Sequence, residues 1–497
     1  MAKKNKDNLR WWILLTVIIG TFLGRLDQTV VNLAIPKIIN EFAITVSAAG
    51  WIATAYILAN AVFVPVWGKL GDSIGRKKIY ILGFTIFIFG SVLAGLSWNL
   101  SSLLVFRVIQ AIASSADYPT AMAILTVTFK AGKERAQALG IWSVSFAAAI
   151  VFGPLIGGPL IDNLGWRWVF YINLPVGILG LFMAIIFIEE SKSDIKSKKF
   201  DWWGAIILGI SLSALVLVLD QGITWGWLST YALMCYLVVI VSGIIFYFIE
   251  IKHPEPIVDF KFFKNAVFTG TLINNVIVFM GLTGGVFLIP LFVQTFLGYD
   301  ATQTGYLFIP LAVFMFIGSF IGGRVVGKIK ANYVIASSTL VAGIGMFLLS
   351  YIDPRSTAIN IIIPMSILAL GLGFGMPQRT TAIASSVPES EIGIASSVLA
   401  LARNIAGAFG IAMFTTILTN SVNTNLINTA KYSVLHVKTP ITYQLYTGLI
   451  ILKAQISAYS TVFLVASIVM FVGAIAAIFI RVHHEKKLSP EMMIDAG

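Results

Sequence analysis

The chain alternates between long apolar runs and short polar connections along almost its whole length. A helix needs about 20 apolar residues to cross the ~30 Å hydrocarbon layer of a bilayer, and the runs have this length. The pattern therefore predicts fourteen membrane-spanning helices. They lie near residues 11–35, 47–67, 79–98, 102–126, 138–161, 168–188, 202–220, 231–250, 267–294, 303–326, 332–351, 358–381, 393–418 and 456–480.

Composition places the chain among all-α polytopic membrane proteins. Apolar residues make up 58% of its 497 residues, charged residues make up 11%, and the mean hydropathy is +0.90. The first run is too long, and too polar around Asp27, to be a cleaved signal peptide, so we keep it as the first span. In such a protein the net charge of +12 concerns the loops around the membrane, and we expect no nucleic-acid partner.

Basic residues gather in every second connection between the spans. They are Lys69, Arg76, Lys77, Lys78, Lys130, Lys133, Arg135, Lys192, Lys196, Lys198, Lys199, Lys252, Lys261, Lys264, Arg324, Lys328 and Lys330. The positive-inside rule assigns these connections to the cytoplasm, so we expect both termini there, in a protein of the cytoplasmic membrane. The connection after span thirteen carries Lys431, Lys438 and Lys453, but long loops obey the rule least.

Two loops echo each other and divide the chain into units. Residues 68–71 (GKLG) and 323–328 (GRVVGK) each follow one span and precede another, and internal repeats of this kind are typical of transporters. Spans one to six then correspond to spans nine to fourteen. The expected units are an N-terminal six-helix bundle (1–188), a cytoplasmic linker (189–200), an inserted helix pair (201–265), a C-terminal six-helix bundle (266–481) and a cytoplasmic tail (482–497).

Asp27 lies inside the first span, where a carboxylate would be surrounded by lipid or by other helices. Placing an aspartate there costs roughly 2.5–3.5 kcal/mol on insertion scales, so such residues usually handle protons or cations. Arg25 lies about 160° away around the helix, so the two charges cannot share a face. We expect Asp27 to face a substrate cavity. The alternative is that it forms an ion pair that holds spans one and four together.

Four motifs make the whole chain resemble the fourteen-span drug:proton antiporter family of the major facilitator superfamily. Residues 68–78 (GKLGDSIGRKK) are similar to the superfamily's loop signature, while residues 26–36 and 165–177 (GWRWVFYINLPVG) resemble fourteen-span exporters. The resemblance implies a major facilitator fold and a conformational latch at the loop, although the loop's charges can also simply obey the positive-inside rule. The latch residues are Gly68, Asp72, Gly75, Arg76 and Lys77.

The fourth motif lies in the fifth span, at residues 153–158 (GPLIGG). A proline with neighbouring glycines kinks a helix and lets helices pack closely, so a tight helix crossing is one interpretation. The resemblance implies a second one, because this motif marks exporters rather than importers in the superfamily. Its residues here are Gly140, Gly153, Pro154, Gly157 and Gly158, and Ala149 stands where a glycine is usual.

Span four carries Arg107, Gln110 and Asp117, which match or extend the buried Arg and Gln of the family. At 100° per residue, Gln110 and Asp117 are about 20° apart, with Arg107 roughly 60° to the side, so they can line one cavity. Ser114 joins this face and Tyr118 adds an aromatic wall beside the carboxylate, which suits an organic cation. A purely structural ion pair remains the alternative for Asp117.

The second half contains no acid within its predicted spans from Phe268 to Met413. We therefore expect the proton-coupling residues in the first bundle, at Asp27 and Asp117 with Arg107 beside them. Desolvation favours the neutral form of a carboxylate, which lets it hold a proton until a substrate arrives. The expected substrate contacts are Asp27, Asn32, Trp51, Tyr56, Gln110, Asp117, Tyr118, Asn274, Asn275, Gln294 and Gln378.

The predicted function is proton-coupled efflux of lipophilic, cationic drugs by alternating access. Because Arg25 and Arg107 balance two acids, the alternative is export of a neutral, zwitterionic or anionic metabolite, lipid or peptide, or nutrient symport. We expect a monomer in the lipid bilayer that binds a small molecule and protons, with no enzymatic activity. No cofactor or nucleotide is expected beyond the proton gradient, because Gly327-Lys328 is followed by Ile329 instead of the Ser or Thr of a phosphate loop. The four histidines lie in loops or the tail, so we expect no metal site.

Overall fold

The computed structural model consists of helices and short connections, without strands, over the residues that it describes, which are 2–129, 133–191, 201–254, 256–387, 392–431 and 440–480. Its helices are α1 (Ala2–Phe42), α2 (Val46–Ile74), α3 (Arg76–Gly95), α4 (Leu100–Ser114), α5 (Asp117–Thr128), α6 (Lys133–Leu164), α7 (Trp168–Tyr171), α8 (Asn173–Phe187), α9 (Trp202–Trp225), α10 (Thr230–Lys252), the 3-10 helix η1 (Phe260–Lys264), α11 (Ala266–Phe296), α12 (Ala301–Val325), α13 (Ala331–Leu349), α14 (Ala358–Ser385), α15 (Ile392–Lys431) and α16 (Pro440–Ile478).

These helices confirm the predicted spans. Thirteen stretches are long and apolar enough to cross a membrane over the described residues, and α6 supplies the remaining span of the predicted fourteen. The predicted linker lies outside the described residues from 192 to 200, and the predicted tail lies outside them entirely.

Two of the spans are interrupted, and a proline explains each interruption. The fourth span breaks between α4 and α5, and the sixth breaks between α7 and α8. Pro119 and Pro175 each occupy the third residue of the second helix. A proline has no N–H, and its ring clashes with the carbonyl four residues earlier, here that of Ser115 or Tyr171. The first helix therefore ends there, and a new one begins with the proline in its first turn.

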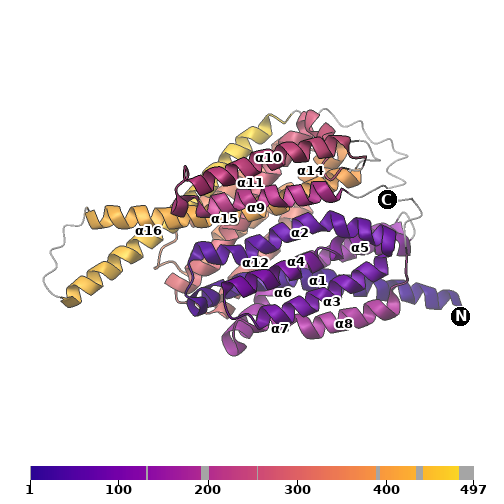
Figure 1. Cartoon of the computed structure of the whole chain (residues 1–497), viewed down its shortest axis with the longest axis horizontal. Helices are drawn as coiled ribbons and strands as arrows, with labels where there is room; N and C mark the ends of the chain where they lie inside the picture. The colour runs from indigo at the N-terminus through magenta and orange to yellow at the C-terminus, as the bar shows by residue number, and fades with distance from the viewer. Residues whose placement is uncertain are drawn as a thin grey trace.

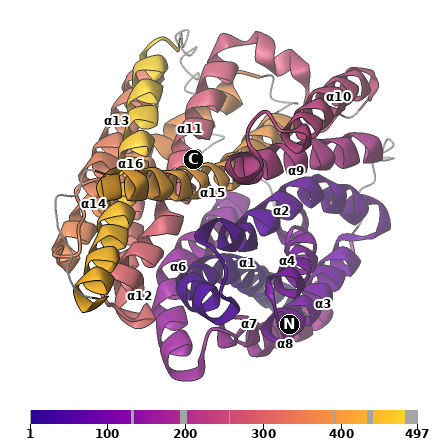
Figure 2. The same cartoon turned by 60° about the vertical axis from the view of Figure 1, so that its left-hand side comes forward.

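The helices form two bundles with an extra pair on the outside (Figure 1). Helices α1–α8 make the N-terminal bundle and α11–α16 make the C-terminal bundle, and α1 begins at the end of the molecule away from the protruding ends of α15 and α16. We call this the terminal end and the other the opposite end. Figure 2 shows α9 and α10 beside α2 and α15, where Leu212 and Val216 of α9 pack against Leu58 and Ala412.

The two bundles close over each other at the opposite end. One continuous core there unites Val30 and Ile38 of α1 and Ala49 of α2 with Phe287 and Val293 of α11. These residues are between 0% and 1% exposed. The core therefore belongs to both bundles and closes the molecule at the opposite end.

Helices α15 and α16 continue well beyond the other helices at the opposite end, which corrects the predicted ends of spans thirteen and fourteen (Figure 1). Residues 419–431 contain no glycine or proline, so nothing in the backbone stops α15 where the apolar run stops. Asn425 of α15 donates from Nδ2 to the carbonyl of Ala454 in α16 at 3.5 Å. Hydropathy therefore predicts where α15 leaves the membrane, whereas the helix itself continues beyond that boundary to Lys431.

Candidate functional site

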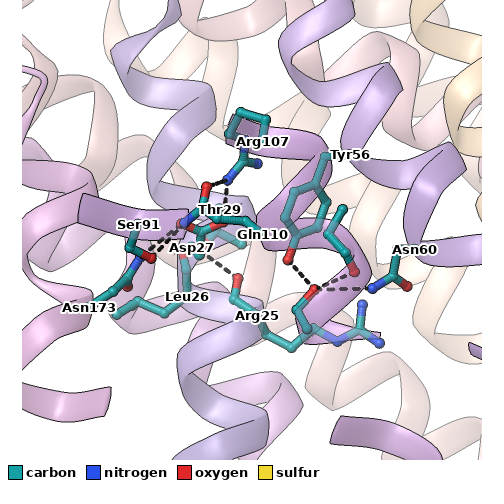
Figure 3. Close-up of polar contacts among 12 residues, drawn as sticks. Arg25, Leu26, Asp27, Thr29, Tyr56, Asn60, Ser91, Arg107, Gln110 and Asn173 are labelled. Atoms are coloured by element: carbon teal, nitrogen blue, oxygen red, sulfur yellow. Dashed lines mark hydrogen bonds and ion pairs between the residues drawn. The ribbon is translucent and has the colours of Figure 1, made fainter. Parts of the chain in front are cut away.

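Asp27 is the centre of a buried polar network inside the N-terminal bundle (Figure 3). Asp27 and Arg107 are each 1% exposed and form an ion pair between α1 and α4. Asn173 of α8 donates from Nδ2 to Oδ1 of Asp27 at 2.9 Å. Gln110 donates to the same oxygen at 3.4 Å and to Oγ of Ser91 on α3 at 2.6 Å. The carboxylate thus connects α1, α4 and α8 directly, and Gln110 extends the network to α3.

The ring of Tyr56 covers the Arg107 guanidinium on the side of α2. Cζ of Arg107 lies 4.1 Å from the ring centroid, a cation–π geometry. The Tyr56 hydroxyl is hydrogen-bonded to Oγ of Ser114 at 2.7 Å, and Asn60 donates to the same Oγ at 3.2 Å. Tyr56 is 1% exposed, so the expected contact between this ring and a substrate is not available in this conformation.

The position of Asp27 corrects the expectation that it faces a substrate cavity. The carboxylate points into the bundle, where the alternative interpretation placed it, because an unpaired charge there would be costly and Arg107 compensates it. Arg25 lies on the other side of α1, donates to Oε1 of Gln28 at 3.3 Å, and points away from Asp27 (Figure 3). The two charges therefore belong to different surfaces, as the helix geometry predicts.

Asp117, the first residue of α5, has one carboxylate oxygen without a hydrogen-bond partner. Its Oδ2 accepts from Oγ1 of Thr21 on α1 at 2.7 Å, while Oδ1 is buried and unpartnered among the described residues. Nε1 of Trp142 on α6 donates to the same Thr21 hydroxyl at 2.8 Å. A cavity of about 20 Å³, room for about one water molecule, borders Asp117 and Tyr80. One hydroxyl therefore links this carboxyl to α6.

Gln110 and Asp117 share a side of their span, but that side faces α1 and α3 within the N-terminal bundle. Gln110 contacts Ser91 on α3, and Asp117 contacts Thr21 on α1. The expectation that this face lines the substrate cavity is therefore not met in this conformation. Tyr118 is the exception, since it is 40% exposed and packs on Trp142 with ring centroids 5.5 Å apart.

The glycines of the fifth-span motif bring α6 into close contact with α1. A Cβ on Gly153 would lie 1.9 Å from Oγ1 of Thr29, and one on Gly157 would lie 2.6 Å from Cγ1 of Val30. Both positions therefore require glycine. The surroundings of Gly140 lie outside the described residues.

The same motif also packs α6 against α12 of the other bundle. A Cβ on Gly158 would lie 2.5 Å from Cα of Thr302, and one on Gly305 would lie 2.5 Å from the carbonyl oxygen of Pro154. Asp162 accepts from the backbone N–H of Thr302 at 2.8 Å and from its hydroxyl at 2.7 Å. The motif residues therefore sit at the contact that must open if the opposite end opens.

Residues 68–74 of the predicted loop are helical and end α2, so that only Gly75 separates α2 from α3, and this segment packs within the N-terminal bundle. A Cβ on Gly68 would touch Pro119 of α5 at 3.4 Å. Gly75 has φ +129°, a backbone conformation that favours glycine, and it lies against the carboxylate of Glu190. Lys77 donates its backbone N–H to that carboxylate at 3.1 Å and its Nζ to the carbonyl of Ile185 at 2.7 Å.

The two remaining latch residues are Arg76 and Asp72. The backbone N–H of Arg76 donates to the carbonyl of Ser191 at 3.0 Å, which ties the start of α3 to the end of the bundle's last helix. The side chain of Asp72 lies outside the described residues. The latch therefore stays a prediction.

In the C-terminal bundle, Asn274 and Asn275 each bind an arginine. Oδ1 of Asn274 accepts from Nε of Arg379 at 2.9 Å, and Oδ1 of Asn275 accepts from Nε of Arg403 at 3.4 Å. Arg379 is 1% exposed, whereas Arg403 is half-buried and reaches Oγ1 of the exposed Thr380 at 3.5 Å. Only the Arg403 group is therefore near a surface that a substrate could reach.

The other expected substrate contacts are dispersed. Nε2 of Gln294 donates to the carbonyl of Leu33 at 3.1 Å, so it bridges the bundles at the closed opposite end. Nε1 of Trp51 donates to Asp220 at 2.7 Å, which attaches α2 to α9. Gln378 is 2% exposed, and Asn32 is half-buried on α1. None of these four joins Asn275 and Arg403 in the described hydrogen bonds.

Sequence reasoning missed three residues that organise these sites. Asn173 binds Asp27, Arg379 binds Asn274, and Asp220 accepts from both Trp51 and Ser47. Each stands as a polar residue within an apolar run, the same signal that drew attention to Asp27.

Comparisons with known proteins agree with this architecture. Residues 17–411 match the family model of the Major Facilitator Superfamily. The chain is 34% identical over 431 residues to the multidrug transporter protein MdtP of Bacillus subtilis, which covers 86% of this chain and 78% of MdtP. It is 32% identical over 425 residues to multidrug resistance protein 3 of the same organism, covering 84% of this chain and 81% of that protein.

A solved structure has the same fold. The crystal structure of a bacterial homologue of the human lysosomal transporter Spinster, inward-facing and unoccupied, matches with a TM-score of 0.68 at 18% identity. The match covers 96% of this chain and 99% of that one. The chain therefore belongs to the Major Facilitator Superfamily, whose members are transporters of small molecules and not enzymes.

Proposed function

We propose that this protein exports lipophilic compounds in exchange for protons, by alternating access between its two bundles. The names of its relatives, a multidrug transporter and a multidrug resistance protein, support transport of drugs, and the fifth-span motif supports export and antiport. If the basic loops mark the cytoplasm, the terminal end is cytoplasmic. The closed opposite end is then the extracellular one, and alternating access would expose the site to the cell when that end is closed.

The observation that carries this proposal is the unpartnered oxygen of Asp117. A buried carboxyl with one free oxygen has a place for a proton on that oxygen. Asp27 is less suited to this task, because both of its carboxylate oxygens already have partners in Arg107, Asn173 and Gln110. We assign Asp117 as the proton carrier and the pair of Asp27 with Arg107 as the element that holds the N-terminal bundle together.

Asp117 is connected to the contact between the bundles. Its charge favours the hydrogen bond from Thr21, whose hydroxyl in turn accepts from Trp142 of α6. Protonation of Asp117 weakens that acceptor and so alters the position of Trp142. Because α6 packs against α12 through Gly158, a shift of α6 would change the closure of the opposite end.

Two places in the protein favour substrates of different charge. A cationic drug could bind near Asp117 and Tyr118, as the sequence predicts. The C-terminal bundle favours the second candidate, a compound that is not cationic. Its positively charged Arg403 contacts the exposed Thr380 and would repel a cation that entered there.

The proposal is tested in proteoliposomes with an imposed pH gradient and a fluorescent lipophilic dye. The parent protein should move the dye only when the gradient is present, and Asp117→Asn should stop this movement. Asp27→Asn serves as the comparison, with each variant first confirmed as folded by size-exclusion chromatography. Dye movement by the parent that is equally fast without a gradient would refute proton coupling.

A further inference from the structure

The helices of the C-terminal bundle contain buried positive charge and no acid. The sequences of α11 to α16 include no aspartate or glutamate. Arg379 and Arg403 nevertheless lie well inside the spans of α14 and α15. Arg403 is five residues from Val398, where the span in α15 begins, a rise of about 8 Å. Charges at this depth are usually paired with one another or serve a ligand.

Arg379 has a structural role that leaves its charge uncompensated. It donates to Oδ1 of Asn274 at 2.9 Å, to Oγ1 of Thr339 at 2.8 Å and to Oγ of Ser338 at 3.2 Å. All three acceptors are neutral, and an arginine side chain stays protonated in proteins. The group therefore joins α14 to α11 and α13, and it adds a positive field to the middle of the bundle.

Arg403 lies within this field and has little hydrogen bonding of its own. Arg379 and Arg403 are close enough to repel each other electrostatically. The contacts of Arg403 to Asn275 at 3.4 Å and to Thr380 at 3.5 Å are long, and its other guanidinium donors have no acceptor among the described residues. A guanidinium offers five N–H donors in a planar fork. Most of that capacity is available to a ligand.

The amide of Asn275 adds a donor at the same place. Its Oδ1 accepts from Arg403, and its Nδ2 is buried with no partner, in a residue that is 0% exposed. A buried amide donor without an acceptor is costly, typically about 1–3 kcal/mol, so such a group usually marks a missing partner. Because both atoms belong to one amide group, the free donor is next to the Arg403 guanidinium. Every free group here is a donor.

Apolar surface borders this donor cluster. Cζ of Arg403 lies 5.0 Å from the ring centroid of Phe279 on α11. Tyr118 of the other bundle is 40% exposed and lies near Arg403. A molecule between Tyr118 and Arg403 would therefore contact an aromatic ring from each bundle.

We propose that Arg403 and Asn275 form a binding subsite for the anionic group of the exported compound, which makes the substrate an amphipathic acid. This inference rests on the proposed export function and specifies its substrate class. The acid is a carboxylate, sulfonate or phosphate, which accepts two parallel hydrogen bonds from the guanidinium. Its apolar body packs on Phe279 and Tyr118. Arg379 acts as a positioning residue, because its charge raises the affinity of the site for an anion without touching it.

The test uses three probes that share one apolar body and differ in charge: pyrenebutyrate, pyrenebutanol and a pyrenebutyl trimethylammonium salt. Equilibrium binding is measured by fluorescence anisotropy with the full-length protein in phosphatidylcholine nanodiscs. The variants are Arg403→Gln and Arg403→Lys. Arg324→Gln is the matched control, because it removes the same charge from an exposed position of the same bundle.

The parent should bind pyrenebutyrate at least tenfold more tightly than pyrenebutanol. Arg403→Gln should abolish this preference while binding of pyrenebutanol stays within about twofold, Arg403→Lys should keep part of the preference, and Arg324→Gln should keep all of it. If the parent prefers the cation, or if Arg403→Gln keeps the preference for the acid, the anion subsite is refuted.

Two further arms separate the possible sources of failure. Nanodiscs containing phosphatidylglycerol test whether a lipid phosphate occupies the subsite. If this lipid weakens the binding of pyrenebutyrate to the parent but not to Arg403→Gln, the membrane is the source of the anion. If it does not weaken that binding, the natural ligand is a free acid. Transport of the three probes under a pH gradient tests export separately. Binding that depends on Arg403 without transport would refute the export proposal alone, whereas transport of the cation or alcohol without preference for the acid would refute the subsite alone.

Discussion

The buried pair of Asp27 and Arg107 makes the sharpest prediction about stability. Asp27→Asn keeps the shape of the side chain but leaves the Arg107 guanidinium without a counter-charge at 1% exposure. Removing one partner of a buried ion pair costs about 3–5 kcal/mol, because the remaining charge stays desolvated. Folded proteins are stable by roughly 5–15 kcal/mol, so this loss is a large fraction of the total. Asp27→Asn should therefore be folded but clearly less stable.

A double-mutant cycle isolates the pair. Arg107→Met removes the charge and keeps much of the side-chain volume, so the double variant with Asp27→Asn should be more stable than the sum of the two single losses by about 2–3 kcal/mol. The free energies come from titration with sodium dodecyl sulfate in mixed micelles. Asp117→Asn is the control: its described hydrogen bond comes from neutral Thr21, so its cost should be about 1 kcal/mol. Additive losses, or an Asp27→Asn loss as small as that of Asp117→Asn, would refute the reasoning.

Two more predictions concern the contacts around the bundles. Gly158→Ala places a Cβ 2.5 Å from Cα of Thr302, so the closed opposite end should not form. The distance between spin labels on α6 and α12 at that end, measured by double electron–electron resonance, should therefore increase. Gly448→Ala, with nothing within 4 Å, is the control, and unchanged distances in Gly158→Ala would exclude the close contact. Asp220→Asn weakens a charge-assisted hydrogen bond from Trp51, and we expect a loss of about 1.5–3 kcal/mol together with faster amide exchange in α9. Protection of α9 equal to that of the parent would show that this bond does not hold the helix pair in place.

Hydropathy predicted the spans because lipid imposes a length and a composition on every helix that crosses it. The same principle explains where the prediction was wrong. It placed a loop after residue 418, whereas α15 continues to Lys431, because water-exposed polar residues can remain helical. The break before Asp117 was not predicted, although Pro119 carried the signal for it.

Side-chain pairing across helices was harder to predict from the sequence. Helix periodicity separated Arg25 from Asp27 correctly, but it cannot say which neighbouring helix each face meets. The sequence therefore allowed Asp27 either to line a cavity or to form an ion pair, and the position of α4 decides for the ion pair. The same limit applies to Asn275, which was expected to contact substrate, while its partner Arg403 lies on a helix more than a hundred residues later.

Comparison of exchange with net transport tests the central claim most directly. Proteoliposomes loaded with labelled substrate are diluted into unlabelled substrate without a pH gradient, and separately into buffer with one. The account predicts that the parent performs both processes and that Asp117→Asn performs only the gradient-independent exchange, since it can still alternate but cannot carry a proton. Gradient-driven export that survives in Asp117→Asn would contradict the assignment of Asp117 as the proton carrier.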